Sequence, residues 1–457
     1  MFNTTAEPLN GSTVQRFNSS TSQPLNVVLF VMESVGARYV ELCGAPYRNT
    51  PELVHLAERA VTFDRIYASH PCTSSAIAGI FCSVYPYHGW RAIPPRAPGL
   101  NVPGLADVLA GHGYRTAFLH TGDLRFDHQG EFLRRHGFEQ VADVAEPDAL
   151  LGTTGSNGIG PSATLVASDF LSLPDRLLRP AALKWIDSDR SRPFFLTLWT
   201  IETHHPYLGA EENAPNSPRP SLGEGLGVRG RDRGGPSASV NFGSVAHTIA
   251  DPYFNRYLGA IRSTDALIGE LARELEARGL AESTLIVVLG DHGDAFGQHG
   301  HRAHGQTLYE DEVRIPILLV NPGLFPRAER ISRVGQQIDI GPTVLDLIGL
   351  PTPPEWQGTS LFATDRPDRA YLFTGFHHYL FGFVEGNFKY IYDATTDRRE
   401  LYDLGSDPAE QRNLIRSPQH ADRASEAHRR LAAWLSYQNN YLAGFISTVS
   451  DHRPHRP

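Results

Sequence analysis

Residues 284–289 read Thr284-Leu-Ile-Val-Val-Leu289, and Gly290-Asp291-His292-Gly293 follows at once. A continuous apolar and β-branched run of this kind is typical of a strand that is buried on both faces of a parallel sheet. In open α/β sheets, ligands bind at the carboxyl ends of the strands. A carboxylate and an imidazole at that edge are well placed to hold a cation. Taken alone, Asp-His-Gly could equally be a polar turn.

Acidic and histidine side chains follow two other predicted strands. Residues 26–32, Asn-Val-Val-Leu-Phe-Val-Met, are followed directly by Glu33, which could alternatively cap the next helix. Residues 194–199 form another apolar run, and Glu202-Thr203-His204-His205-Pro206-Tyr207 comes after it. A lone histidine is more often structural. Three polar clusters at strand ends nevertheless predict a functional site at this edge of the sheet.

A hydroxyl-rich turn leads into a predicted helix of small residues. It places four possible nucleophiles side by side: Cys72, Thr73, Ser74 and Ser75. The N-terminus of a helix offers unpaired N–H groups and partial positive charge, which favour an anion. Ser and Thr are also the ordinary N-caps of helices. This segment alone therefore leaves open whether its hydroxyls cap the helix or attack a substrate.

The composition suits a soluble globular enzyme and gives no electrostatic reason to expect nucleic acid as a partner. The 457 residues are 41% hydrophobic and carry a formal charge of -9. Cys43, Cys72 and Cys82 are too few for a disulfide framework. Neither a secretory signal nor an apolar run long enough to span a membrane is visible, so localisation stays open.

The predicted domain organisation is a catalytic domain followed by a smaller C-terminal subdomain. The catalytic domain covers residues 25–350 and the C-terminal subdomain covers residues 351–440, with a disordered leader over 1–24 and a tail over 441–457. Residues 215–238 contain 13 Gly, Pro or Ser among 24, which predicts a disordered insertion. Residues 371–404 read as antiparallel strands, with Gly386-Asn387 as a two-residue hairpin turn.

The order of these clusters resembles the sulfatase-like branch of the alkaline phosphatase superfamily. The resemblance covers residues 26–415 and is carried by Asn26–Glu33, Thr50-Pro51, Thr73–Pro86, His204–Tyr207, Gly290–Gly293, His304-Gly305, Leu308-Tyr309, Ile338–Thr343, Glu400–Leu404 and Asp407-Pro408. It implies an α/β alkaline-phosphatase-like sandwich with a central mostly parallel sheet and a smaller C-terminal antiparallel-sheet subdomain. It also implies a metal-assisted attack on a phosphate or sulfate ester.

Departures from the family pattern indicate one branch of the superfamily. True sulfatases convert a Cys or Ser to formylglycine, and the converting machinery recognises Pro or Ala two residues on and Arg four residues on. Counted from Cys72, those positions hold Ser74 and Ala76. Counted back from Tyr85-Pro86, the nucleophile position of the family falls on Thr73. An unmodified threonine is the pattern of the phosphoethanolamine and phosphoglycerol transferases and of the superfamily's phosphodiesterases.

The resemblance therefore implies a metal-dependent phosphodiesterase or phosphotransferase with a phosphothreonine intermediate. The alternatives are a sulfatase that works without formylglycine and a catalytically inactive family member. The expected substrate is a small-molecule, glycan or lipid-headgroup ester. The lipid-anchor transferases, which share a glutamate at the first metal position, carry N-terminal membrane helices that this sequence lacks.

The implied site holds one divalent ion and three further polar side chains. The implied metal ligands are Glu33, Thr73, Asp291 and His292, and two carboxylates, a hydroxyl and an imidazole favour Mn²⁺ or Zn²⁺ over Mg²⁺ or Ca²⁺. His204 and His304 are expected to bind the phosphoryl group, stabilise its charge and protonate the leaving oxygen. Thr121 falls on the family's active-site lysine and is the remaining substrate-binding candidate. Thr73 is the expected nucleophile.

Overall fold

The protein is organised around one mixed β-sheet. The computed structural model describes residues 24–88, 92–97, 100–146, 150, 165–167, 170–207 and 251–445. The strand order is β12-β2-β11-β8-β1-β7-β3-β4, with β13 beside β2. The strands are β1 (Asn26–Met32), β2 (Ala60–Tyr67), β3 (Arg115–His120), β4 (Gln140–Ala142), β7 (Phe194–Trp199), β8 (Thr284–Gly290), β11 (Arg314–Val320), β12 (Glu329–Ile331) and β13 (Gly335–Gln336).

Most neighbouring strands in this sheet run parallel. β11 is antiparallel to both β2 and β8, whereas β1, β3 and β7 pair in parallel with their neighbours. The predicted α/β fold with a mostly parallel central sheet is confirmed. The predicted insertion, and most of the predicted leader and tail, lie outside the described residues.

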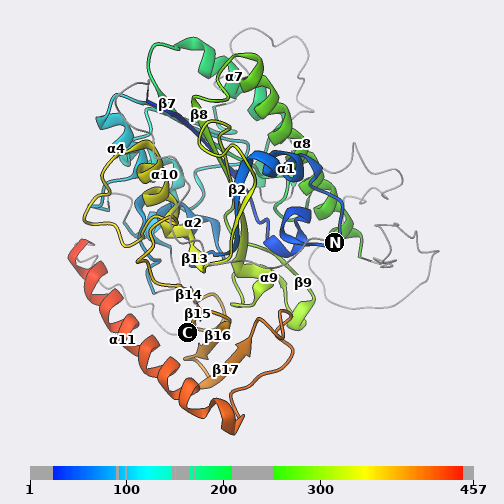
Figure 1. Ribbon diagram of the computed structural model, residues 1–457, viewed down its shortest axis with the longest axis vertical. Coiled ribbons are helices and arrows are strands. Elements are labelled where there is room, and N and C mark those ends of the chain that lie inside the picture. The colour runs from blue at the N-terminus through cyan, green and yellow to red at the C-terminus, as the bar shows by residue number, and fades with distance from the viewer. Residues whose placement is uncertain are drawn as a thin grey trace, which may run out of the picture.

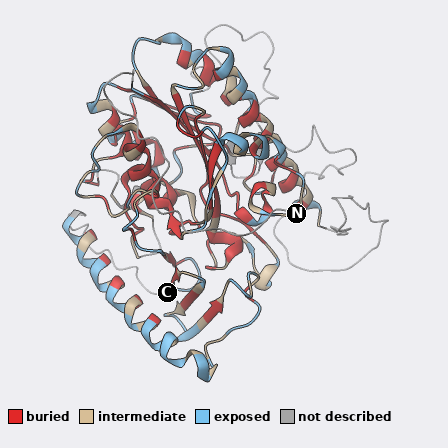
Figure 2. Ribbon diagram, viewed as in Figure 1, coloured by how far each residue is buried: buried red, intermediate tan, exposed pale blue. Residues whose placement is uncertain are grey.

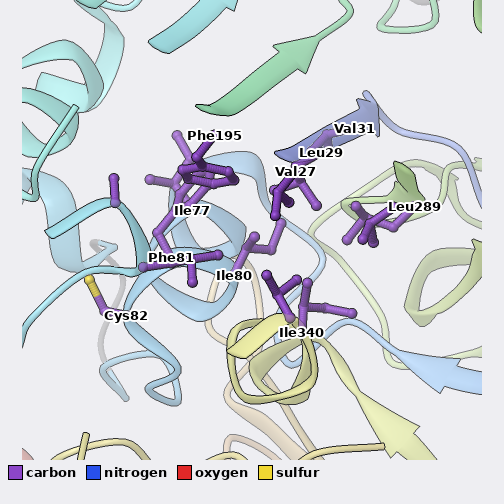
Figure 3. Close-up of a cluster of buried hydrophobic side chains, with 14 of the residues drawn as sticks. Val27, Leu29, Val31, Ile77, Ile80, Phe81, Cys82, Phe195, Leu289 and Ile340 are labelled. Atoms are coloured by element: carbon purple, nitrogen blue, oxygen red, sulfur yellow. The ribbon is translucent and has the colours of Figure 1, made fainter. Parts of the chain in front are cut away.

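Both faces of the sheet are covered by helices, which explains why its strands are apolar without alternation. One face packs against α2 (Thr73–Cys82), α4 (Leu105–Gly111) and α10 (Ile340–Ile348), and the other against α1 (Pro51–Leu56), α7 (Leu178–Ser188) and α8 (Pro252–Ala277) (Figure 1). Val27, Leu29 and Val31 of β1 lie in the first of these cores (Figure 3). Their neighbours Val28 and Phe30 lie in the second. Buried residues accordingly run through the whole sheet (Figure 2).

A second, antiparallel sheet forms the C-terminal part of the described chain. Its strands follow the order β14 (Arg369–Thr374), β15 (Leu380–Glu385), β16 (Phe388–Asp393) and β17 (Arg398–Asp403). Glu385 pairs with Phe388 across the predicted Gly386-Asn387 turn. Helix α11 (Ala421–Phe445) packs along this sheet (Figure 1). We expect α11 to end near residue 436 from its sequence, but it continues because Leu442 is also buried.

A buried ion cluster joins the two sheets. Lys389 of β16 is fully buried, and its Nζ lies 3.1 Å from a carboxylate oxygen of Glu310 and 2.8 Å from one of Glu410. Glu310 begins α9 (Glu310–Val313), which lies between the candidate site and β11 in the chain. Burial alone would lower the pKa of Lys389, but the two carboxylates outweigh it and raise the pKa. We refer to these three residues as the Lys389 ion cluster.

The remaining short elements connect the larger ones. They are α3 (Ile93–Arg96), α5 (Gln129–Arg135), β5 (Leu165–Ala167), β6 (Phe170–Ser172), β9 (Ala295–Phe296) and β10 (Arg302–Ala303). β9 and β10 pair with each other and carry the loop that leads to His304. Among the described residues, no helix combines the length and apolar character needed to cross a membrane.

Candidate active site

The predicted metal ligands meet at the carboxyl ends of β1 and β8. These two central strands run parallel, and Met32 pairs with Gly290, so that Glu33 and Asp291 leave the sheet side by side. The possible ligand atoms of Glu33, Asp291 and His292 all lie within 4.8 Å of one another, and all three residues are buried. The sequence interpretation of these strand ends as a common site thus matches their placement in space.

Two glycines allow the loop after β8 to pack closely against its neighbours. A Cβ atom at Gly290 would lie 2.2 Å from the carbonyl oxygen of Val35, and one at Gly293 would lie 2.0 Å from that of Asp311. No real side chain tolerates such distances without a shift of the backbone. The glycines on either side of Asp291 and His292 therefore hold the loop against the segments that follow β1 and β10.

Glu33 is an ionised carboxylate with three hydrogen-bond donors. Trp199 Nε1 donates to its Oε2 at 2.7 Å, and the hydroxyls of Thr73 and Ser34 donate to its Oε1 at 2.8 Å and 3.2 Å. Burial by itself would raise the pKa of Glu33. The imidazoles of His292 and His204, together with hydrogen bonds from Trp199 and Thr73, lower it to about 2.

Asp291 carries an oxygen that no protein group satisfies. Its Oδ1 accepts hydrogen bonds from the backbone N–H groups of Ser34 at 2.7 Å and His292 at 2.8 Å. Its Oδ2 is buried and makes no hydrogen bond. Burial and the adjacent charge of Glu33 raise the pKa of Asp291 well above its usual range. A cation between the two carboxylates would relieve both the repulsion and the missing partner.

The ring of His292 is oriented so that one nitrogen faces this cluster. Its Nδ1 lies 3.0 Å from the carbonyl oxygen of Gly293, which can only accept, so Nδ1 carries the proton. Its Nε2 lies 3.4 Å from Asp291 Oδ2 and 3.9 Å from Glu33 Oε1. Burial and the charge of His304 lower the pKa of His292 to about 4. A neutral imidazole with a free lone pair completes a donor set that fits a divalent metal ion.

Thr73 places its hydroxyl within the same cluster. It is the first residue of α2, and its Oγ1 lies 2.8 Å from Glu33 Oε1 and 3.3 Å from His292 Nε2. The hydroxyl is not used as the N-cap, because the cap position is Cys72 and no side chain forms a cap hydrogen bond there. The alternative in which Thr73 only caps the helix therefore lacks its hydrogen bond.

The two side chains that flank Thr73 have other surroundings. Burial raises the pKa of the Cys72 thiol to about 11, so that Cys72 is not a thiolate near neutral pH. The Ser74 hydroxyl donates to Asp127 Oδ2 at 2.8 Å and accepts a hydrogen bond from Gln129 at 3.1 Å. Of these three neighbours in sequence, Thr73 is the one in hydrogen-bond contact with Glu33 and His292.

Two further imidazoles lie beside His292. The ring of His304 is 4.4 Å from that of His292 and 5.3 Å from that of His204, measured between centroids. His304 Nδ1 lies 3.1 Å from Asp294 Oδ1. Burial would lower the pKa of His304, but the hydrogen bond to Asp294 and its negative charge raise it. The hydrogen bond between His304 and Asp294 therefore favours the cationic form of the imidazole.

The residues that position His304 were not among the predicted site residues. Asp294 is fully buried, and Tyr207 donates to its second oxygen at 2.6 Å. Tyr207 ends the His204–Tyr207 motif, and Asp294 directly follows the Gly290–Gly293 motif. Trp199, which holds Glu33, is likewise the last residue of a predicted strand. Adjacency to these motifs was the signal that could have found them.

Thr121 follows β3 and is fully buried. Its hydroxyl donates a hydrogen bond to Asp175, whose carboxylate also accepts from the backbone N–H groups of Ile201 and Glu202 at 3.0 Å each. These bonds tie the ends of β3 and β7 together. The predicted contact of Thr121 with substrate would require its hydrogen bond to Asp175 to break, so that role stays a prediction.

Comparison with known proteins gives two family matches. The sequence model described as Sulfatase matches residues 25–350, and the one described as N-sulphoglucosamine sulphohydrolase, C-terminal, matches residues 297–436. A protein named uncharacterized sulfatase YidJ, of Escherichia coli (strain K12), is 25% identical over 94% of this chain and 90% of its own. The choline-sulfatase of Rhizobium meliloti (strain 1021) is 24% identical over 87% of this chain and 84% of its own.

Solved structures share the fold. One, in complex with its substrate D-glucosamine-2-N,6-O-disulfate, has a TM-score of 0.69 at 16% identity and covers 93% of this chain and 100% of its own. Another is the lipoteichoic acid synthase LtaP from Listeria monocytogenes, with a TM-score of 0.63 at 18% identity over 94% of this chain and 96% of its own. The alkaline-phosphatase-like architecture predicted from the sequence is thereby confirmed.

Proposed function

The chain belongs to the sulfatase family of the alkaline phosphatase superfamily and is a sulfatase-like ester hydrolase. From this premise we propose that it attacks a phosphoester with the hydroxyl of Thr73. The observation that carries the proposal is the position of Thr73 Oγ1, 2.8 Å from Glu33 and 3.3 Å from His292 at the start of α2. A hydroxyl is a weak nucleophile at neutral pH unless its surroundings activate it. The Glu33–Asp291–His292 cluster is such a surrounding.

One divalent metal ion would be held by Glu33, Asp291 and His292 together with Thr73. The orphaned oxygen of Asp291 and the free nitrogen of His292 support this ligand set. Two carboxylates, an imidazole and a hydroxyl favour Mn²⁺ or Zn²⁺ over Mg²⁺ or Ca²⁺. When bound, the ion would supply the positive charge that lowers the pKa of the nucleophile and stabilises negative charge on the substrate.

The protein side chains carry out the proton transfers and the nucleophilic attack. Glu33 Oε1 accepts the hydrogen bond of the Thr73 hydroxyl and is placed to receive its proton. The oxygen of Thr73 forms a bond to phosphorus, the bond from phosphorus to the leaving alcohol breaks, and the alcohol takes a proton from His304. The cationic form that Asp294 favours on His304 suits both this step and the binding of phosphoryl oxygens. The ring of His204 lies beside that of His304, with 5.3 Å between the centroids.

Water would release the phosphothreonine in a hydrolase, and an acceptor hydroxyl would do so in a transferase. An unmodified threonine and a glutamate at the first metal position resemble the phosphoethanolamine and phosphoglycerol transferases of this superfamily. The likeness in fold to a lipoteichoic acid synthase is compatible with that branch. Hydrolysis is the simpler proposal for this chain, because it needs no second organic substrate.

The second candidate is a sulfate ester, cleaved without formylglycine. The names of the relatives favour it, since they are sulfatases, and so does the sulfated sugar in one structural neighbour, which makes a glycan ester a natural substrate class to test. Against it stand the missing conversion signal after Cys72 and Thr121 at the position of the family's active-site lysine. A catalytically inactive protein is a third reading, which the intact Glu33–Asp291–His292 cluster argues against.

A substrate panel separates these candidates. The purified protein, with its metal content determined, is assayed on 4-nitrophenyl phosphate, bis(4-nitrophenyl) phosphate and 4-nitrophenyl sulfate after loading with Mn²⁺ or Zn²⁺. We expect the phosphodiester to be turned over faster than the sulfate ester and Thr73→Ala to lose turnover by orders of magnitude while staying folded. A clear preference for the sulfate ester would favour the second candidate. Absence of turnover from the metal-loaded protein on all three esters would support the inactive reading.

A further inference from the structure

The turn that delivers Thr73 contains a histidine to which the proposed mechanism gives no part. His70 precedes Thr73 by three residues, and its carbonyl oxygen accepts a hydrogen bond from the N–H of Cys72 at 2.8 Å. The carbonyl oxygen of Ser69 accepts one from the N–H of Phe373 at 2.9 Å. The turn is therefore fixed against the end of β14, and the position of the His70 ring is determined by the fold.

The His70 ring lies between the C-terminal sheet and the candidate site. Its centroid is 5.4 Å from that of Phe373 on one side. On the other side of this turn, a Cβ atom at Gly305, next to His304, would lie 3.6 Å from the carbonyl oxygen of Pro71, next to His70. Thr374, the next residue of β14, donates its hydroxyl to the carbonyl oxygen of Gly305, directly after His304. His70 thus lines the side of the site that faces the C-terminal subdomain.

One ring nitrogen of His70 lacks a partner. Nδ1 is buried and forms no hydrogen bond with any protein group. Buried polar atoms of this kind are uncommon in folded proteins and need an explanation. Burial, with the nearby charges of His292, His88 and His304, lowers the pKa of His70 to about 3. A neutral imidazole with its proton on Nδ1 can donate one hydrogen bond to an ester or alcohol oxygen.

We propose that His70 contacts the substrate and hydrogen-bonds through its unpartnered ring nitrogen to the leaving alcohol oxygen of the ester. This inference rests on the function proposed above. The phosphoryl group would face Glu33, Asp291 and His292, whereas the leaving oxygen would lie between His304 and His70, on the side of β14. The segment after β14 exposes the aromatic side chains of Phe376 and Tyr379, with 71% and 42% of their surface accessible. His70 would fix the leaving oxygen opposite the attacking Thr73.

The test compares two esters that differ in the quality of the leaving group. His70→Phe keeps an aromatic ring against Phe373 but removes both nitrogens, and His70→Gln restores a hydrogen-bonding group. For the phenyl ester, whose phenolate is a poor leaving group, we expect kcat/KM of His70→Phe to fall by roughly tenfold to a hundredfold. For the 4-nitrophenyl ester, whose oxygen needs less stabilisation, we expect a smaller loss. His70→Gln should recover part of the activity and decides the test if the Phe variant does not fold.

His88→Phe is the matched control. His88 packs against the ring of Phe373 at 5.1 Å, and its Nδ1 contacts Asn439 at 3.3 Å on the α11 side. Its Nε2 is also buried without a partner, so it shares the packing of His70 but lies fifteen residues after Thr73, outside the turn that delivers it. We expect His88→Phe to keep both activities within about twofold. Metal content and the unfolding transition are measured for every variant.

The possible results distinguish a failure of the proposed function from a failure of the role proposed for His70. Wild-type protein that turns over neither ester, or Thr73→Ala that keeps its turnover, overturns the proposed function and this inference with it. An active wild type with His70→Phe within twofold of it overturns the role of His70 alone. Equal losses on both esters, matched by His88→Phe, would also overturn it, because they would show that the ring only supports packing.

Discussion

Replacing Asp291 by asparagine should make the metal-free protein more stable while abolishing its response to metal. The substitution keeps Oδ1, which accepts from the N–H groups of Ser34 and His292, and puts an amide in place of the unpartnered Oδ2. That amide can donate to Glu33, which is already ionised. The change removes one of two adjacent buried carboxylates and adds a hydrogen bond without changing the size of the side chain.

The magnitude follows from the geometry. Two unit charges no more than 4.8 Å apart repel by at least about 3.5 kcal/mol at an effective dielectric constant of about 20. The raised pKa of Asp291 removes part of this repulsion by protonation, so we expect Asp291→Asn to add about 2 kcal/mol to the free energy of unfolding of the metal-free protein. Saturating Mn²⁺ at about 100 times its Kd should add about 2.7 kcal/mol to the wild type and little to the variant.

The assay is urea unfolding of chelator-treated protein, with and without added Mn²⁺, beside a matched control. Asp265 is also a buried carboxylate, but both of its oxygens accept backbone hydrogen bonds, from Glu52 at 3.0 Å and Leu53 at 2.9 Å. Asp265→Asn should lose stability and keep the metal response. Equal stabilisation of Asp291→Asn and wild type by Mn²⁺, or a metal-free Asp291→Asn that is clearly less stable than wild type, would refute the reasoning.

Three other perturbations test separate parts of the molecule. Because Asp294 raises the pKa of His304, the cationic form of His304 is present at low pH and is lost as the pH rises through that raised pKa. Asp294→Asn should therefore move the alkaline limb of the pH–rate profile to lower pH. An alkaline limb that does not move would contradict this. Lys389→Met leaves two carboxylates of the Lys389 ion cluster buried without their cation, and should cost about 3–5 kcal/mol in urea unfolding. Deletion of residues 215–238 should leave the melting temperature and turnover nearly unchanged, since long insertions cost little loop-closure entropy; a large loss of turnover would mean that they form part of the site.

The sequence was sufficient for the fold and for the cluster at the carboxyl ends of β1 and β8. Uninterrupted apolar runs identify strands covered on both faces, and parallel neighbours deliver the residues that follow them to one edge. Their positions after such strands placed Glu33, Asp291 and His292 at one edge of the sheet, and the resemblance to the family supplied their role as metal ligands. The hairpin turn at Gly386-Asn387 was equally local, since a left-handed glycine fixes it.

What the sequence could not supply depends on side-chain geometry between distant segments. Tyr207 stood in a quoted motif and Asp294 directly after one, yet their hydrogen bond joins segments that are 87 residues apart in the chain. Thr121 was assigned by position within a family pattern, but its hydroxyl is bonded to Asp175, which no motif contains. His70 could be recognised only once β14 was known to pack against the turn before Thr73. Such contacts follow from the fold rather than from any local pattern.

The identity of the nucleophile is tested most directly by trapping the covalent intermediate. The metal-loaded protein is quenched in acid during turnover of a slow ester, digested, and its peptides are sequenced by mass spectrometry. We predict a phosphoryl adduct, or a sulfuryl adduct if the substrate is a sulfate ester, on Thr73 in the wild type and on no residue in Thr73→Ala. An adduct on Ser74 or Ser75, or a formylglycine at Cys72, would contradict the central claim.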